Sequence, residues 1–103
     1  MNSMEKYTKL VRDKIPEILG EKGIPYEKRF ASEEELKDWL VLKLEEEIAE
    51  FKEAKNVEEL ADILEVIKAL QDLPEFADVE SVREKKKEER GGFEKGIILT
   101  GEK

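Results

Sequence analysis

The 103-residue sequence contains neither cysteine nor histidine. Without cysteine, the chain cannot form a disulfide bond, a thiolate nucleophile or a zinc–thiolate site. Without histidine, it cannot form a Ser-His-Asp triad, an imidazole general base or the Glu-x-x-His pairs that hold di-iron centres in helical bundles. Any chemistry that this chain performs must therefore use carboxylates, lysines, arginines, hydroxyl groups, water or a metal ion.

Long apolar runs are also missing, and basic residues are fewer than acidic ones. No apolar stretch reaches the length of a membrane span and no signal peptide is visible, so we expect a cytoplasmic protein with no membrane partner. The net charge is −8 and the isoelectric point is about 4.8. Duplex DNA and bulk RNA bind basic surfaces, so we expect no duplex nucleic-acid partner. A nucleotide remains a suitable partner if metal ions and a few cations offset its phosphate charge.

Charge and apolar periodicity are what the sequence does have. Charged residues make up 45% of the chain and hydrophobic residues 39%. Both signs of charge are interspersed, and apolar residues recur at helical spacing, which indicates a folded protein. The length suits a single domain over residues 1–103 with one modest core.

Capping signals predict two long central helices. Ser32, with Glu35 three residues later, forms a capping box, and a helix should run from there to about Ala54. The run "NVEE", residues 56–59, is a second and weaker signal, and it starts a helix that ends near Pro74. Because only a few residues separate the two helices, we expect them to form an antiparallel hairpin.

Shorter elements should flank this hairpin. Asp13 is expected to cap a short first helix that stops at Gly23, and a last helix should cover residues 78–91. The segments 24–31 and 96–100 are candidates for a minor β-pair. The predicted fold class is therefore all-α.

The second long helix is apolar around much of its circumference. Its main stripe is formed by Leu60, Ile63, Leu64, Ile67 and Leu70. Because a single hairpin cannot bury two apolar faces of one helix, we expect a homodimer or homotetramer that forms a helical bundle on association.

Four carboxylates repeat at one spacing on the two long helices. Glu47 falls inside the apolar stripe and Glu50 follows three residues later, while Glu59 and Asp62 repeat this spacing. In an antiparallel hairpin that turns near Lys55, the two pairs would face each other. Four close carboxylates repel one another, and divalent cations remove that conflict. Oxygen ligands without histidine or cysteine favour Mg²⁺, Mn²⁺ or Ca²⁺.

Each of these residues taken alone also has an ordinary explanation. Glu59 is the third residue of a capped helix, and Glu50 could pair with Lys43 or Lys55. The set is harder to explain in this way, because a charge without a partner is rarely buried. An open carboxylate cage that takes phosphate oxygens as further metal ligands would suit a metal–nucleotide complex.

These residues also carry a family resemblance. The run "EEIAE", residues 46–50, followed by "ELAD", residues 59–62, resembles the EExxE…ExxD signature of the MazG-like all-α nucleoside triphosphate pyrophosphohydrolases. That group includes phosphoribosyl-ATP pyrophosphohydrolase. The flanking runs "KLVRDKIPEIL", residues 9–19, and "ERGGFEKGI", residues 89–97, are similar to its small phosphoribosyl-ATP pyrophosphohydrolase-like branch. The resemblance covers nearly the whole chain, but the spacing between the two acidic motifs is shorter than in many members.

The resemblance implies a Mg²⁺-dependent enzyme, with Mn²⁺ as an alternative metal. It implies cleavage of a nucleotide between the α- and β-phosphates, which yields a nucleoside monophosphate and pyrophosphate. The implied metal ligands are Glu47, Glu50, Glu59 and Asp62. Catalytic roles fall to Glu46 and Glu47, with Glu46 orienting water or supporting the ligands. Such chemistry relies on metal ions and positioning, so the missing histidine and cysteine are no obstacle.

Two basic runs supply candidate phosphate-binding residues. They are Arg83, Lys86, Lys87 and Arg90 near the end of the last helix, and Arg12 and Lys14 near the start of the chain. The first group also suits the dipole of a helix C-terminus, and the second could form surface pairs with Asp13 or Glu17. The alternative to an enzyme is a non-catalytic helical interaction module whose acidic face docks a basic partner.

Overall fold

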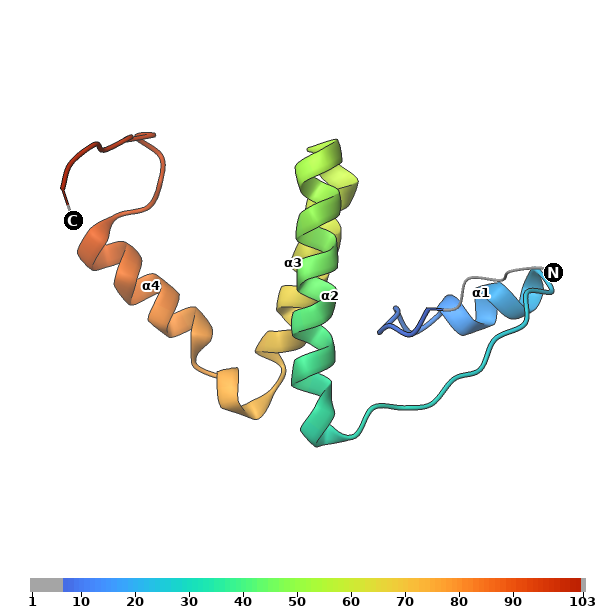
Figure 1. Ribbon diagram of the computed structural model, residues 1–103. Helices are drawn as coiled ribbons and strands as arrows, with labels where there is room; N and C mark the ends of the chain where they lie inside the picture. Colours follow the sequence, from blue (N-terminus) through green and yellow to red (C-terminus); the bar gives the residue numbers. More distant parts are fainter. Residues whose placement is uncertain (1–6, 103) are drawn as a thin grey trace. The chain divides into compact units, whose positions relative to one another are not determined.

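The computed structural model describes residues 7–102, and every regular element within them is helical. The all-α prediction is therefore confirmed for this part of the chain. The fold divides into two compact units, one that reaches Leu70 and one that starts at Gln71 (Figure 1). None of the described helices is both long and apolar enough to cross a bilayer. The assignment of residues 1–103 to a single domain stays a prediction.

The first helix, α1, spans Ile15–Glu21. Its N-cap is Lys14 and no side chain caps it, so the prediction that Asp13 caps this helix is wrong. The physical reason is that Pro16 has no N–H to donate, and the N–H of Ile15 donates to the carbonyl of Arg12 at 3.0 Å instead. The predicted stop at Gly23 is confirmed, because its φ of 71° places it in the left-handed region that ends helices.

The long helix α2 spans Glu33–Ala54 and begins at the predicted capping box. The Glu35 N–H donates to Ser32 Oγ at 3.3 Å, and the Ser32 N–H donates to Glu35 Oε2 at 2.9 Å. Arg29 donates to both oxygens of the same carboxylate at 2.8 and 2.9 Å, and Trp39 Nε1 donates to one of them. The Arg29 guanidinium, with smaller contributions from Ser32 and Trp39, holds the pKa of Glu35 far below its usual range.

The helix α3 spans Val57–Gln71 and follows α2 after a connection of two residues, Lys55 and Asn56. Its predicted capping signal is confirmed, because the Glu59 N–H donates to Asn56 Oδ1 at 2.9 Å. Lys55 ends α2 in the left-handed region with a φ of 48°. Its N–H donates to the carbonyl of Phe51 at 2.7 Å, which completes the turn between the helices.

Few of the described side chains are buried. Leu40 on α2 and Val66 on α3 are 4% and 7% exposed, and the only other buried residue is the charged Glu47 at 6%. Large apolar side chains of the same two helices remain exposed: Val41, Leu42, Ile48, Leu60, Leu64 and Ile67. The described chain therefore covers only part of the apolar surface that α2 and α3 carry.

The second unit holds a 3₁₀ turn, Pro74–Phe76, and the helix α4, Val79–Arg90. The position of α4 agrees with the helix predicted over residues 78–91. Pro74 starts the 3₁₀ turn soon after α3 ends, and Gly91, with a φ of 85°, follows the last residue of α4. No residue of α4 is buried.

The predicted β-pair between residues 24–31 and 96–100 is wrong, because neither segment contains a strand. A hydrogen bond from the Gly96 N–H to the carbonyl of Phe93 closes a turn instead. The following Ile97, Ile98 and Leu99 are 76%, 94% and 90% exposed. The physical reason is that two short strands alone are at best marginally stable.

Candidate metal centre

Three of the four predicted carboxylates meet where α2 lies beside α3. Glu47 and Glu50 come from α2 and Glu59 comes from α3, and one carboxylate oxygen of each lies within 4.8 Å of the other two. Glu47 is buried, Glu59 is half-buried and Glu50 is exposed. We refer to Glu47, Glu50 and Glu59 as the acidic cluster.

Two oxygens of the acidic cluster are buried without a hydrogen-bond partner, Oε2 of Glu47 and Oε2 of Glu59. A buried polar atom without a partner costs about 1–3 kcal/mol, and more if it is charged, so such atoms call for an explanation. A cation bound between the two side chains would satisfy both oxygens.

The spacing of the acidic cluster suits a hard divalent cation. Two opposite ligands of Mg²⁺ lie about 4.2 Å apart and two opposite ligands of Ca²⁺ about 4.6–5.2 Å apart, and ligands at smaller angles lie closer together. Three oxygens within 4.8 Å of one another are therefore near enough to surround one such cation once their side chains rotate toward it. The donor set, three carboxylates and no nitrogen or sulfur, agrees with this class of metal.

Interactions within the acidic cluster raise the pKa of Glu50. Glu47 raises the pKa of Glu50 above its ordinary value of 4.5, first through a hydrogen bond that the two carboxyls share and then through charge repulsion. Glu59 and Glu46 add smaller repulsive contributions. Metal-free protein thus holds a proton at Glu50 more tightly than an isolated carboxyl would.

Lys43 is a cation inside the site. The sequence analysis named it only as a possible partner of Glu50. Its Nζ lies 2.8 Å from Glu46 Oε1 and 3.2 Å from Glu47 Oε1, and its side chain is 16% exposed. Burial alone would lower the pKa of Lys43, but the hydrogen bonds to Glu46 and Glu47 outweigh it and the pKa is raised. The i,i+3 and i,i+4 spacing from Lys43 to these two residues was the signal that could have found it.

Glu46 lies outside the acidic cluster and has a lysine on each oxygen. Lys43 donates to its Oε1 at 2.8 Å, and Lys9 donates to its Oε2 at 3.0 Å. The hydrogen bond from Lys43 is the largest influence on the pKa of Glu46, which is lowered although burial acts against it. A carboxylate held in this way is a weak proton acceptor and is better suited to orienting its neighbours.

Asp62, the fourth predicted ligand, has a different partner. Its Oδ1 accepts a hydrogen bond from Arg12 Nη2 at 2.7 Å, across 50 positions of the sequence. The structure thus joins a predicted metal ligand to a predicted phosphate-binding residue, a contact that sequence reasoning did not anticipate. Both side chains are exposed to a substantial degree, 54% for Arg12 and 38% for Asp62.

The segment before α1 lies against α2 and forms a hollow with it. The hollow is lined by Thr8, Lys9, Leu10, Trp39, Leu42, Lys43 and Glu46. Trp39 is half-buried here, and its indole nitrogen is bonded to Glu35. The hollow therefore borders the Lys43–Glu46 pair beside the acidic cluster.

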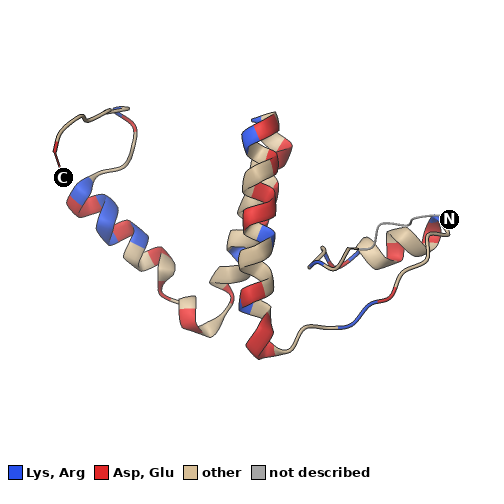
Figure 2. Cartoon of the chain, viewed as in Figure 1, with Lys and Arg blue, Asp and Glu red and all other residues tan. Residues whose placement is uncertain are grey.

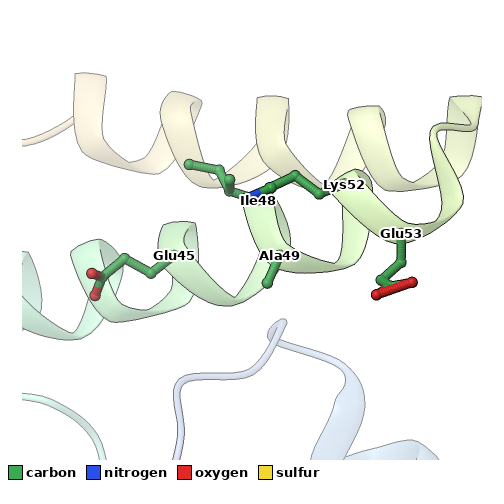
Figure 3. A pocket seen from close by; sticks show the side chains of 5 residues that line it. All are labelled: Glu45, Ile48, Ala49, Lys52 and Glu53. Atoms are coloured by element: carbon green, nitrogen blue, oxygen red, sulfur yellow. The ribbon is translucent and has the colours of Figure 1, made fainter.

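A second and more open hollow lies over α2 alone. Figure 3 shows its lining residues, Glu45, Ile48, Ala49, Lys52 and Glu53. None of them belongs to the acidic cluster, so this hollow does not mark the candidate metal centre. Glu45 is exposed, as the sequence predicted.

The basic residues of the last helix lie in the second unit. Figure 2 shows Lys and Arg gathered on α4. Arg83 Nε donates to Glu80 at 2.9 Å, which raises the pKa of Arg83, and Lys87 lies 3.8 Å from Glu94. The phosphate-binding roles of Arg83, Lys86, Lys87, Arg90 and Lys14 stay predictions.

Comparison of the chain with protein-family models, curated proteins and solved structures finds no match. The resemblance to the pyrophosphohydrolases therefore stays a prediction that rests on the motifs themselves. The case for a metal centre rests on the buried Glu47, its unpartnered oxygen and the two carboxylates beside it.

Proposed function

We propose that this protein is a Mg²⁺-dependent nucleotide pyrophosphohydrolase that cleaves between the α- and β-phosphates. The observation that carries the proposal is Glu47, which is 6% exposed and has an unpartnered oxygen next to Glu50 and Glu59. Lys43 is a partner for Oε1 of Glu47, but the second oxygen is buried without one, and a buried polar atom of this kind calls for a ligand. The acidic motifs and their flanking runs supply the substrate class.

In this proposal the acidic cluster holds Mg²⁺, with Mn²⁺ as an alternative, and Asp62 joins it when substrate is bound. When bound, the metal would neutralise phosphate charge and lower the pKa of a coordinated water. Lys43 keeps Glu47 in place by holding its Oε1, which leaves Oε2 for the cation. Glu46 positions Lys43 and Lys9 and does not itself take up a proton, because its pKa is lowered.

The proposed reaction consumes one nucleoside triphosphate and one water. The water oxygen forms a bond to the α-phosphorus, and the bond from that phosphorus to the bridging oxygen breaks. Pyrophosphate leaves with the electron pair, and the attacking water releases a proton to solvent. Arg12 and Lys14 are proposed to bind the phosphates that leave. The phosphate-binding role of the basic residues of α4 stays a prediction.

We also propose that α2 and α3 act as an antiparallel hairpin within a homodimer or homotetramer. The support is the exposed apolar surface of these helices, including Leu42 at 56% and Leu64 at 54%. A second copy of the chain would bury these side chains in a bundle. Sedimentation equilibrium at micromolar concentration should show a dimer or tetramer, and a monomer at that concentration would remove this part of the proposal.

A substrate panel tests the proposed function directly. The protein is incubated with ribonucleoside, deoxyribonucleoside and modified nucleoside triphosphates, with Mg²⁺ or with EDTA, and pyrophosphate is measured. At least one substrate should release pyrophosphate only when Mg²⁺ is present. The matched control is Glu45→Gln, because Glu45 is exposed on the same helix and lies outside the acidic cluster.

The alternative function predicts a different result in the same experiments. No turnover on any substrate, together with no binding of Mg²⁺ or Mn²⁺ by calorimetry, would favour a non-catalytic helical interaction module. In that case the acidic cluster would serve as a docking surface for a basic partner.

A further inference from the structure

Two ion pairs tie the segment before α1 to the long helices. Lys9 pairs with Glu46 on α2 at 3.0 Å, and Arg12 pairs with Asp62 on α3 at 2.7 Å. These contacts cross 37 and 50 positions of the sequence. A positively charged segment thus lies on the carboxylates that border the acidic cluster.

The two kinds of cation in the site differ in how firmly they are held. The Lys43 side chain is 16% exposed and serves two carboxylates, so it is desolvated and fixed. The Arg12 side chain is 54% exposed, and ion pairs this open contribute little to stability. A guanidinium also binds phosphate through two parallel charge-assisted hydrogen bonds, which are stronger than its single bond to an exposed carboxylate. Arg12 is therefore the cation that a phosphate can draw away.

We infer that Arg12 is an exchangeable counterion which couples metal binding to phosphate binding. Without ligands, Arg12 donates a hydrogen bond to Oδ1 of Asp62, so this oxygen is not available to bind the metal. When a phosphate group binds beside the acidic cluster, the guanidinium moves to it and Asp62 becomes available as a ligand. This inference rests on the proposed function for the metal site, but it adds a property that the metal ligands alone do not give. By thermodynamic reciprocity, phosphate strengthens metal binding by the factor with which metal strengthens phosphate binding.

The test measures Mn²⁺ binding to the full chain by calorimetry and by electron paramagnetic resonance, with and without inorganic pyrophosphate. Pyrophosphate also binds Mn²⁺ in solution, so that equilibrium is measured without protein and subtracted. Wild type is compared with Arg12→Gln, Arg12→Lys and the control Arg29→Gln. Arg29 lies in the same unit and pairs with Glu35, so its replacement removes the same charge away from the cluster.

Arg12→Gln should tighten the binding of Mn²⁺ alone by about twofold to fivefold, because a competing cation leaves Asp62. The strengthening of Mn²⁺ binding by pyrophosphate should fall by about tenfold in the same variant. In Arg12→Lys the lysine should still compete with Mn²⁺ for Asp62. Most of the coupling between pyrophosphate and Mn²⁺ binding should be lost, since an ammonium lacks the two parallel donors of a guanidinium. Arg29→Gln should change neither quantity. Circular dichroism in EDTA should show unchanged helix content in all variants.

Two outcomes would overturn the inference, and they can be told apart. Suppose that wild type binds Mn²⁺, but that Arg12→Gln changes Mn²⁺ affinity and its strengthening by pyrophosphate no more than Arg29→Gln does. The proposed exchange of Arg12 between Asp62 and phosphate is then wrong, while the metal site itself is supported. If wild type binds neither Mn²⁺ nor Mg²⁺, the proposed function fails and the inference fails with it.

Discussion

The helices α2 and α4 are both densely charged, yet their charges are placed in different ways. On α4, Arg83 pairs with Glu80 one turn away and no residue is buried. On α2, Glu47 is buried with one oxygen on Lys43 and the other without a partner. A charged helix face alone is ordinary, because solvent and local pairs satisfy it. A buried carboxylate with one unpartnered oxygen is different, because that oxygen needs a further partner, and we propose that a cation supplies it.

The substitution with the largest expected effect is Glu47→Gln, which tests whether the buried carboxylate of α2 differs in function from the solvated charges of α4. The change removes one charge of the acidic cluster, and Mg²⁺-dependent activity should fall by more than about 100-fold, since even supporting residues of metal sites matter by 10–100-fold. The metal-free fold should survive or become more stable, because the amide oxygen can still accept from Lys43 and a repelling charge is gone. Calorimetry for Mg²⁺ and thermal melting in EDTA measure the two effects.

Glu45→Gln is the matched control and should be silent in both measurements, as Glu45 is exposed on the same helix. If Glu47→Gln instead unfolds the protein while metal affinity is unchanged, Glu47 is a structural partner of Lys43 and the metal centre is wrong.

The comparison between the two helices is sharpened by replacing a half-buried lysine of α2, Lys43→Met, and an exposed lysine of α4, Lys87→Met. Loss of Lys43 leaves Glu47 buried beside other carboxylates, and we expect metal-free stability to fall by about 1–3 kcal/mol, somewhat less than for a fully buried pair. Lys87 is 58% exposed and 3.8 Å from its partner, so its replacement should leave the melting temperature unchanged. Denaturant unfolding in EDTA at fixed protein concentration measures the difference.

Mg²⁺ provides a second check on Lys43→Met. A bound cation takes over part of the role of the lost ammonium, so saturating Mg²⁺ should raise the melting temperature of this variant more than that of wild type. An equal shift in the two proteins would mean that Lys43 and the metal do not share Glu47.

The basic residues of α4 give a smaller expected effect. If Lys86 and Arg90 bind substrate phosphates, replacing both with glutamine should raise KM for the triphosphate by about fivefold at low salt. Thermal stability should not change, since α4 has no buried residue. An unchanged KM would leave these cations as ordinary complements of the helix C-terminus.

The smallest expected effect is a pH dependence of the stability of the metal-free protein, and it arises from Glu50. Its folded-state pKa lies above 4.5, so metal-free protein gains stability as the pH falls through that raised value, and the gain is complete below 4.5. Glu35 and Glu46 have lowered pKa values, so they lose their stabilising contribution only as the pH falls below 4.5. Melting temperatures in EDTA between pH 7 and 4.5 should therefore rise on acidification in wild type.

That rise should shrink in Glu50→Gln and persist in Glu45→Gln. Mg²⁺ should act in the opposite direction, since the cation must displace the proton on Glu50 and so binds less tightly as the pH falls. A wild-type profile that is flat above pH 4.5 would show that the carboxylates of the cluster do not interact.

Local signals of the sequence predicted much of this fold. The Ser32–Glu35 capping box and the Asn56 cap are short-range motifs, and the helices begin where these motifs place them. Glu47 could be identified because a charge within an apolar stripe is anomalous by itself. Asp13 failed as a cap because Pro16 has no N–H, which was visible in the sequence, and because the N–H of Ile15 donates to the carbonyl of Arg12, which was not.

Contacts between distant segments could not be predicted in the same way. The Arg12–Asp62 and Lys9–Glu46 pairs depend on where the segment before α1 lies against the long helices, and no local pattern fixes that. The wrong β-pair has the same origin. An apolar run such as residues 97–99 indicates a strand only if a partner is available, and this depends on tertiary structure.

The two-residue connection between α2 and α3 determines where the acidic residues of α3 lie relative to those of α2. Only Lys55 and Asn56 lie between the end of one helix and the start of the next. Each residue added to α3 before Glu59 would rotate the side chains beyond it by about 100° and carry Glu59 away from Glu50. Lys55 adopts a left-handed conformation that only a few residue types accept readily, so the turn is both short and conformationally restricted. The length of this turn thereby sets which carboxylates of α2 and α3 lie close to one another.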